Sequence, residues 1–345
     1  MNYKAKRAFI GLAEDIDDYL GEKKGDAIFH RELDRVMVEA FQWNAWFTEE
    51  NISYSLKGIV HMLDPEKIEQ WEKSYNSTDQ ENQRTIGLIM AGNLPLVGFH
   101  DLLCVLFSGN NALVKMSSDD SVLLPILLDR LFHHETSLAE KVRFCEKLTG
   151  YDAVIATGSN NSARYFDYYF NNVPNIIRRN RNSVAVLTGE ESSEDLKMLG
   201  LDLFTYFGLG CRNVSKVYIP KDFDLNRLFE AIVDYGYLVQ HNKYGNNYDY
   251  YKAIYLMNSD KLIENGFLLV KEDSSLHSPV AMLFYERYQD LNVLSAQLIE
   301  IENEIQCIVS NTPTINNCIP LGKSQLPELW EYADGIDTMK FLLEL

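Results

Sequence analysis

The chain has 345 residues, of which 46% are hydrophobic and 24% are charged, and its formal net charge at pH 7 is −18. This length suits roughly two domains of ~150 residues each, and the composition is that of an ordinary globular protein. So acidic a chain is not expected to bind nucleic acid non-specifically or to be attracted to an anionic membrane. No apolar run reaches the ~18 residues of a membrane span, and the early acidic residues do not resemble a secretory signal.

The cysteines and histidines indicate neither a disulfide framework nor a metal site. The five cysteines are odd in number, scattered and without CxxC spacing. His30 and the pair His133-His134 show no metal-ligand spacing with acidic neighbours. We therefore expect reduced thiols, a cytoplasmic protein and no bound metal. The cysteines are Cys104, Cys145, Cys211, Cys307 and Cys318.

The N-terminal part is predicted to be helical up to about residue 80. Amphipathic helices are expected at 27–41, and at 65–75 after a proline start. In the first of these, the apolar residues expected on or near one face are Phe29, Leu33, Val36, Val38 and Phe41.

From Thr85 onward, short apolar strands alternate with helices, which is typical of a parallel α/β sheet. No low-complexity linker divides the chain, so we place a compact domain border near Arg181. The expected strands are 86–90, 112–116, 153–156, 184–187, 216–219, 253–257, 267–270 and 280–285. The expected helices are 97–106, 122–131, 138–148, 162–170, 195–207, 225–233 and 293–305.

Three turns follow predicted parallel strands, where open α/β sheets place their ligands. Asn93 lies in the turn Gly92-Asn93-Leu94-Pro95 and can offer a side-chain amide as a donor. Lys115 ends a buried strand, where an ammonium group is costly unless it meets an anion or a hydroxyl. Gly158 and Ser159 open a helix whose N–H groups can bind an anion. A surface lysine and a helix-capping serine are the ordinary alternatives for the last two turns.

A fourth feature is the segment Gly208-Leu209-Gly210-Cys211-Arg212-Asn213, between a predicted helix and a predicted strand. Glycines let the backbone approach a bound molecule closely, so Cys211 would be presented to a cleft. The alternative is a thiol that packs as a small hydrophobic side chain.

In order, these motifs resemble the aldehyde dehydrogenase superfamily, and within it the acyl-CoA reductase branch, which includes the fatty-acid reductase subunit of bacterial luminescence systems. The resemblance implies an α/β fold of two parallel-sheet domains with the active site in the cleft between them. It divides the chain into N-terminal helices plus a nicotinamide cofactor-binding domain (1–183), a catalytic domain (184–310) and a C-terminal return segment (311–345). The matching stretches are AGNLP (91–95), SGNNALVKMSS (108–118), IATGS (155–159), YFGLGCRNVSKVYIP (206–220), SPVAMLFYE (278–286) and PLGKSQLPELWEYADG (320–335).

The resemblance also implies roles for individual residues. Cys211 would take up the acyl group as a thioester, and Asn93 with the Cys211 N–H would form the oxyanion hole. Lys115 would bind the adenosine ribose and, in NADP(H), its 2′-phosphate. Gly158 and Ser159 would lie at the pyrophosphate. Ser118, at the end of its motif, is counted with these cofactor residues.

Two departures from the family pattern affect the chemistry. Val186 is expected at the position of the glutamate that hydrolytic members use as a base, and Glu190 and Glu191 are expected to point elsewhere. The acyl-enzyme would therefore resist water. Ser275 stands where the resemblance places a glutamate that binds a ribose of the cofactor, so this departure leaves the choice between NAD(H) and NADP(H) open. NADP(H) is the expected cofactor, with NAD(H) as the alternative.

Two further features could contribute to ligand binding or catalysis. The cluster Arg178, Arg179 and Arg181 could meet a phosphate, although a solvated charged turn is the favoured interpretation. The tyrosine-rich segment 235–251 could line an acyl tunnel or could simply pack, and His241 within it is a candidate proton donor.

These observations predict an NAD(P)H-dependent enzyme that reduces a long-chain fatty acyl thioester to the aldehyde. The donor would be acyl-CoA or an acyl-protein, and an acyl-activating synthetase or a transferase is a candidate partner. A homo-oligomer is expected from the resemblance. The alternatives are an acyl carrier or transferase that uses the same cysteine without hydride transfer, a CoA-acylating aldehyde dehydrogenase working in reverse, and a degenerate structural subunit.

Overall fold

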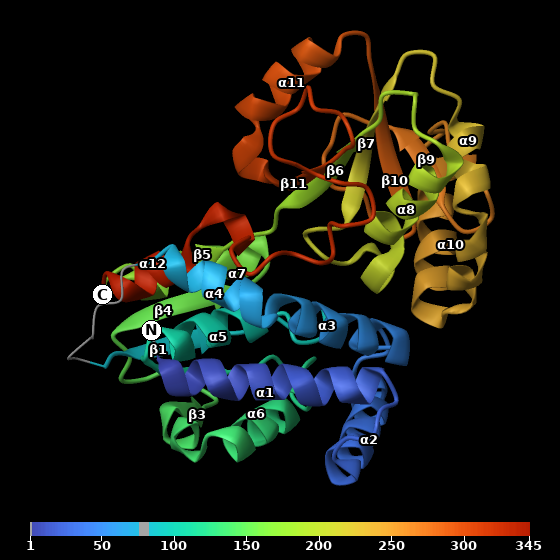
Figure 1. Ribbon diagram of the computed structural model, residues 1–345. Coiled ribbons are helices and arrows are strands. Elements are labelled where there is room, and N and C mark those ends of the chain that lie inside the picture. Colours follow the sequence, from blue (N-terminus) through green and yellow to red (C-terminus); the bar gives the residue numbers. More distant parts are fainter. Residues whose placement is uncertain (1, 76–82) are drawn as a thin grey trace. The chain divides into compact units, whose positions relative to one another are not determined.

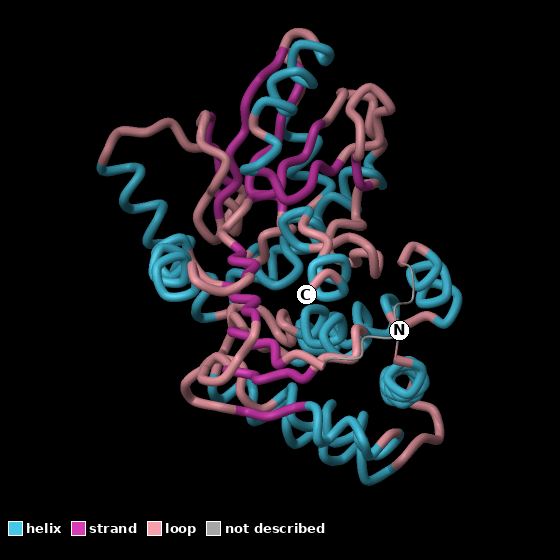
Figure 2. Tube along the Cα trace, turned by 90° about the vertical axis from the view of Figure 1, so that its left-hand side faces the viewer, coloured by secondary structure: helices cyan, strands magenta, loops and turns pink. Residues whose placement is uncertain are grey.

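The computed structural model describes residues 2–75 and 83–345, and the chain divides into two compact units. The first unit is Met1–Asn180 together with Pro327–Leu345, and the second is Arg181–Leu326. Each unit is an α/β structure built on its own sheet, with the strands drawn in magenta and the helices in cyan (Figure 2). The predicted α/β fold class is confirmed.

The first unit contains a five-stranded parallel sheet in the order β3-β2-β1-β4-β5. Four of these strands, β1, β3, β4 and β5, are labelled in Figure 1. The chain moves outward from β1 in one direction and then continues from β4 in the other, so the topology switches between β1 and β4. Its strands are β1 (Thr85–Ile89), β2 (Asn111–Lys115), β3 (Val142–Phe144), β4 (Ala153–Thr157) and β5 (Asn175–Arg178). Its helices are α1 (Tyr3–Leu20), α2 (Ala27–Trp43), α3 (Glu49–Met62), α4 (Pro65–Lys73), α5 (Phe99–Phe107), α6 (Leu123–His134), η1 (Thr136–Lys141), α7 (Asn160–Phe170), η5 (Ala333–Gly335) and α12 (Thr338–Leu343).

Alternate residues of β4 show that both faces of this sheet are covered. Ala153 and Ile155 belong to the large core that also includes residues of α1 to α6 and α12. Val154 and Ala156 pack instead in a smaller cluster with Phe170 of α7. Successive side chains of a strand point to opposite faces, so α7 covers the face opposite to the large core.

The second unit contains a seven-stranded sheet in the order β12-β11-β6-β7-β10-β9-β8, parallel except for the β8–β9 pair. Helix α11 packs on one face through Leu294 and Leu298, which meet Val184, Val186 and Tyr218. Its strands are β6 (Asn182–Val186), β7 (Val214–Pro220), β8 (Ile263–Glu264), β9 (Leu269–Glu272), β10 (Met282–Tyr288), β11 (Ile305–Val309) and β12 (Cys318–Ile319). Its helices are α8 (Ser193–Phe204), η2 (Thr205–Gly208), α9 (Leu225–Ala231), η3 (Val233–Gln240), α10 (Asn242–Met257), α11 (Leu291–Glu300) and η4 (Glu302–Glu304).

Most predicted elements exist with shifted ends, but three predictions are wrong. The expected helix 138–148 is the short helix η1 followed by β3, because Val142 pairs with Ala112 at the sheet edge. The expected strand 253–257 is the end of α10, whose apolar residues Leu256 and Met257 stay exposed. A compact apolar run cannot be assigned to strand or helix from periodicity alone.

The third wrong prediction concerns the apolar face of α2. Phe29, Leu33 and Val36 are buried as expected, whereas Val38 and Phe41 are exposed. Strands β3, β5, β8, β11 and β12 were not among the expected elements, and each has at most five residues.

The arginine cluster also differs from the expected solvated turn. Arg178 ends β5 and is buried, and its Nη2 lies 2.6 Å from Asp101 Oδ1 on α5. It also donates to Ala333 O and to Thr338 Oγ1 in the C-terminal segment, so its donors bind the protein itself. Arg179, the next residue, forms an exposed pair with Asp167. Arg178 therefore fixes the C-terminal segment to the first sheet and is not a phosphate ligand.

We predict that Asp101→Ala strongly destabilises the protein, because it leaves the buried Arg178 guanidinium without its carboxylate. Removing one partner of a buried pair typically costs about 3–5 kcal/mol. The measurement is the urea midpoint followed by circular dichroism. The matched control is Asp167→Ala, which removes the exposed partner of Arg179 and should leave the midpoint nearly unchanged. Equal effects of the two substitutions would contradict the buried role of Arg178.

Candidate active site

The three turns singled out in the sequence lie at one edge of the first sheet. Strand β1 pairs in parallel with β2 on one side and with β4 on the other, so their carboxyl ends are adjacent. The turns after these strands carry Asn93, Lys115 with Ser118, and Gly158 with Ser159. This edge includes the topological switch between β1 and β4, which is the usual ligand site of such sheets.

The turn after β1 is held by the turn after β2. Leu96 N–H donates to Asp120 Oδ2 at 2.7 Å, and a Cβ on Gly92 would lie only 2.5 Å from Ser117 Oγ. Glycine is therefore required at 92 by close packing. Asn93, one residue later, is exposed at this edge.

The predicted cofactor residues lie at the same edge. Lys115 Nζ donates to the backbone oxygen of Glu146 at 2.9 Å, while Ser118 is exposed. Ser159 is the N-cap of α7, where its hydroxyl accepts the Ser162 N–H. The capping interpretation of Ser159 is thus confirmed. The other N–H groups of the first helical turn point toward the same edge.

Asp120 is a residue of this edge that the sequence reasoning missed. Its side chain is 9% exposed, and Oδ1 has no hydrogen-bond partner among the described residues. Burial raises the pKa of Asp120 to about 6. The available signal was an acidic pair, Asp119-Asp120, directly after a predicted strand.

In the second unit, Cys211 lies in a turn that follows three residues of left-handed backbone. Tyr206, Phe207 and Gly208 have φ values of 55°, 58° and 77°. Left-handed backbone costs a non-glycine residue roughly 1–3 kcal/mol, and such strain clusters at functional sites. Packing offsets this strain, because Tyr206 and Phe207 are buried. The centroid of the Phe207 ring lies 4.5 Å from that of the His241 ring.

The side chain of Asn213 holds the two ends of this turn together. Its Oδ1 accepts the Gly210 N–H at 2.8 Å, while Nδ2 donates to Asp202 O and to Thr205 O. The side chain is buried, so its amide is committed to the backbone around Cys211. The sequence reasoning assigned no role to Asn213.

Further bonds fix the turn to its surroundings. Arg212 Nε donates to Ser324 O, and the Asp202 carboxylate accepts the Gly322 and Ser324 N–H groups at 2.6 and 2.9 Å. Burial raises the pKa of Asp202. On the other side, Ser183 Oγ donates to Cys211 O at 2.8 Å. Cys211 is partly buried, and none of the five cysteines is in a disulfide.

The pairing register of β6 and β7 bears on Val186, which the sequence analysis expected at the position of the glutamate base of hydrolytic family members. Ser183 pairs with Val214 at the start of β6 and β7, and Val186 pairs with Tyr218 near their end. Cys211 precedes Val214, so Val186 lies roughly 10 Å further along the strands. The expectation that Val186 stands at the base position is therefore wrong.

The segment that leads into β6 lies at the Cys211 end instead. The sequence has no Asp or Glu between Asp167 and Glu190, so this segment brings no carboxylate toward the thiol. Glu191 accepts the N–H groups of Thr188 and Gly189 in its own turn, which confirms that it points elsewhere.

His241 caps α10, where Nδ1 accepts the Tyr244 N–H at 3.4 Å. In the neutral ring, Nε2 then carries the hydrogen. The tyrosines near it are mainly structural: Tyr244 is buried and donates to Phe267 O, and Tyr248 bonds to Glu264. Tyr250 is exposed.

Across residues 2–75 and 83–345, no group of three or more histidine, cysteine or acidic side chains is arranged to hold a metal ion. In the same residues, no helix combines the length and the apolarity that crossing a bilayer requires.

We predict that Asp120→Asn flattens the dependence of stability on pH. The folded-state pKa of Asp120 is raised above its unfolded value, so its stabilising contribution is full below about pH 4 and is lost as pH rises through about 6. The loss is on the order of 3 kcal/mol. Urea unfolding of both proteins between pH 4.5 and 8 measures it. An identical pH slope in the variant would contradict the raised pKa.

Comparison with protein families gives a match over the first unit. Residues 14–177 match the family model described as acyl-CoA reductase (LuxC). The match contains Asn93, Lys115, Gly158 and Ser159 but ends before Cys211. A search of curated protein sequences finds no match to the chain.

Solved structures similar to this chain are aldehyde dehydrogenases at low sequence identity. The indole-3-acetaldehyde dehydrogenase AldA of P. syringae, solved with NAD+, is 12% identical with a TM-score of 0.64, over 94% of this chain and 74% of that one. Aldehyde dehydrogenase 21 of Physcomitrella patens is 10% identical with a TM-score of 0.65, over 97% and 84%. An NADP-dependent enzyme of E. coli is 12% identical with a TM-score of 0.61, over 96% and 77%. The chain therefore has the fold of the aldehyde dehydrogenases, and its residues 14–177 match the LuxC acyl-CoA reductase family, which confirms the resemblance seen in its motifs.

Proposed function

We propose that the chain is an NAD(P)H-dependent reductase that converts a long-chain fatty acyl thioester to the aldehyde through an acyl-Cys211 intermediate. The observation that carries the proposal is the strained turn that holds Cys211, in a chain whose first unit matches the acyl-CoA reductases. The fold and the family match support the reaction class, and the roles of individual residues below are our assignments.

In the first step, the Cys211 thiolate attacks the thioester carbonyl. A C–S bond to Cys211 forms, the donor thiolate leaves, and the acyl group remains on the enzyme. Asn93 and the Cys211 N–H are assigned to stabilise the developing oxyanion, where one donor is commonly worth about 3 kcal/mol.

In the second step, the acyl carbon accepts a hydride, the chemistry that a nicotinamide bound at the edge of the first sheet would supply. In the resulting thiohemiacetal oxyanion the carbonyl re-forms as the C–S bond breaks, the sulfur takes up a proton, and the aldehyde leaves Cys211 as the thiol. His241 is a candidate proton donor, since its capping bond leaves the hydrogen on Nε2.

The edge of the first sheet has donors and acceptors suited to a dinucleotide. Lys115 offers an ammonium group, and the start of α7 at Gly158 and Ser159 offers N–H groups to a pyrophosphate. Ser118 lies exposed in the turn after β2 and offers a hydroxyl. We propose NADPH, whose 2′-phosphate Lys115 would contact, with NADH as the alternative; similar structures include one with NAD+ and one described as NADP dependent.

The lack of a carboxylate in the segment entering β6 supports reduction over hydrolysis. Without a base to activate water, the acyl-enzyme persists until a hydride or another thiol reacts with it. A cytoplasmic homo-oligomer that receives its acyl group from acyl-CoA, or from a synthetase or transferase partner, completes the proposal.

The decisive prediction concerns Cys211→Ala. Wild-type protein should consume NADPH or NADH with a long-chain acyl-CoA and release an aldehyde that mass spectrometry identifies. The variant should lose this turnover by at least about 10³-fold, because no acyl-enzyme can form. The matched control is Cys318→Ala, a partly buried thiol of the same unit, which should retain activity.

An acyl mass on Cys211 without cofactor consumption would contradict the reductase and favour the transferase. Full activity of Cys211→Ala would contradict the nucleophile.

We also predict that Asn213→Ala lowers kcat about 10–100-fold with little change in KM, because a displaced thiol is misaligned for attack. The substitution removes three bonds that hold the turn. Steady-state kinetics and the unfolding midpoint are measured together. Asn226→Ala, at an exposed asparagine of α9, is the control. An unchanged kcat in folded Asn213→Ala would show that the turn needs no such restraint.

A further inference from the structure

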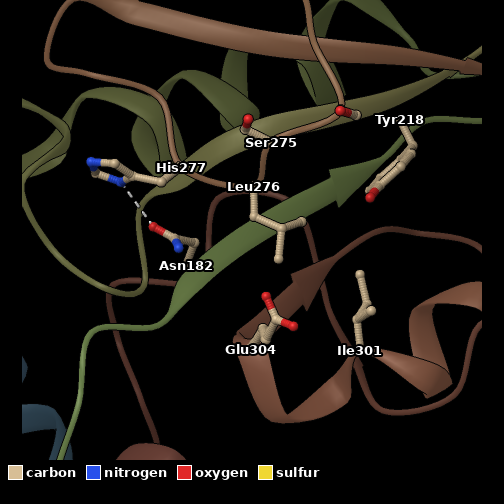
Figure 3. Close-up of a pocket in the computed structure, with 8 residues that line it drawn as sticks. Asn182, Tyr218, Ser275, Leu276, His277, Ile301 and Glu304 are labelled. Carbon is tan, nitrogen blue, oxygen red and sulfur yellow. Dashed lines mark hydrogen bonds between the residues drawn. The ribbon is translucent and has the colours of Figure 1, made fainter. Parts of the chain in front are cut away.

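The second unit contains a cavity of about 420 Å³ (Figure 3). In its wall, Asn182 Oδ1 accepts a hydrogen bond from His277 Nδ1 at 3.0 Å. None of residues 206–213 lines the cavity, and it reaches Tyr218, which pairs with Val186 at the far end of β6. The cavity is therefore separate from the turn that holds Cys211, and we assign it no role in the chemistry of the thiol.

In the first unit, the N-terminal helices reach the turn that carries Asn93. Asn44, at the C-terminal end of α2, donates from Nδ2 to Gly92 O at 3.4 Å. Ser55 of α3 donates from Oγ to Pro95 O at 2.8 Å, the ordinary length of a hydroxyl hydrogen bond. These two bonds hold the backbone one residue before Asn93 and two residues after it.

The turn after β2 holds the same backbone from another element. The Leu96 N–H donates to Asp120 Oδ2 at 2.7 Å, and both residues are buried, so water does not replace this bond. Leu96 has a φ of 60°, a left-handed conformation that is unfavourable for a residue with a Cβ. Asp120 therefore stabilises a backbone shape that the turn would not favour by itself.

The placement of the Asn93 amide depends on this backbone, because the Asn93 side chain is exposed. An oxyanion donor is effective only when it is already held where the negative charge develops. A displacement of about 1 Å in such a group can cost about 10²-fold in rate. Side chains that fix the turn on both sides of Asn93 are thus in a position to set its catalytic effect.

We propose that Ser55 and Asp120 are positioning residues for Asn93, so that helix α3 and the turn after β2 together hold the oxyanion donor. The inference rests on the proposed function, which assigns Asn93 to that role. Neither Ser55 nor Asp120 is assigned a contact with the reacting atoms, since each acts through the backbone of the turn. The N-terminal helices, to which the sequence analysis gave no role, thereby contribute to the proposed site.

The test measures how fast decanoyl-CoA acylates Cys211 in the full-length protein, followed by mass spectrometry. The assay is run at pH 8, where Asp120 is ionised because its pKa is about 6. Asn93→Ala should slow this step about 10²-fold. Asp120→Ala should slow it about 10–100-fold and Ser55→Ala about 3–10-fold. Asp120→Asn, whose amide oxygen can still accept the Leu96 N–H, should stay within about threefold of wild type.

Double variants show whether the two residues act through Asn93. Adding Asp120→Ala or Ser55→Ala to Asn93→Ala should change the rate by less than about threefold, because the position of the amide matters only while the amide is present. The matched controls are Asp129→Ala, at an exposed aspartate of α6, and Ser53→Ala, at a partly buried serine of α3. Both should acylate at the wild-type rate.

Losses that add in the double variants would overturn the inference, and so would a wild-type rate in folded Ser55→Ala and Asp120→Ala. Circular dichroism verifies folding, and if Asp120→Ala does not fold, Ser55→Ala and its double variant decide. Hydrogen exchange tests the restraint without any reaction. The peptide that contains Leu96 should exchange faster in both single variants than in wild type, and unchanged exchange would reject the two restraints.

The acylation assay also separates this inference from the proposed function, because the step needs no nicotinamide. Acylation of Cys211 without consumption of NADPH or NADH would contradict the reductase alone, and the double variants would still decide the roles of Ser55 and Asp120. No acyl adduct on wild-type Cys211 would reject both.

Discussion

The second unit depends on the buried amide of Asn213. Three consecutive left-handed residues, Tyr206 to Gly208, turn the chain from α8 toward β7, and this backbone is unfavourable by itself. Asn213 bonds to the backbone before and after this turn, and Asp202 and Arg212 fix the turn to residues 322–324. Because every one of these polar groups is paired, the position of Cys211 follows from a network rather than from one residue.

The first unit uses the same principle on a different element. The turns after β1 and β2 have no regular structure, yet the Asp120 carboxylate and the contact between Gly92 and Ser117 join them. Asn93 is exposed, but the backbone of its turn is restrained by these contacts with the turn after β2. The cost is a buried carboxyl whose second oxygen is unpaired and whose pKa is raised.

Particular residues show how far the sequence reasoning reached. The turns after β1, β2 and β4 were predicted because turn residues directly follow short apolar strands, a local pattern. Cys211 was singled out because two glycines precede it, and its role as nucleophile was predicted from the resemblance of the motifs in order. Asp120, Asn213 and Asp202 were missed, since each acts through a bond to a backbone group whose position depends on folding. Arg178 looked like a surface charge because its partners, Asp101, Ala333 and Thr338, are far from it in sequence.

The sequence alone determined the α/β fold class and the three turns that follow β1, β2 and β4, because periodicity and turn chemistry act over a few residues. Only the tertiary structure decided which end of a strand each residue occupies. The pairing of Ser183 with Val214 shows that the residues just before β6, and not Val186, lie at the Cys211 end of the strands. No local sequence pattern reveals this register. It also decided which charged groups are paired inside the protein, as Arg178 is with Asp101. The strand register and this pairing depend on contacts between segments distant in sequence, and such contacts form only when the chain packs.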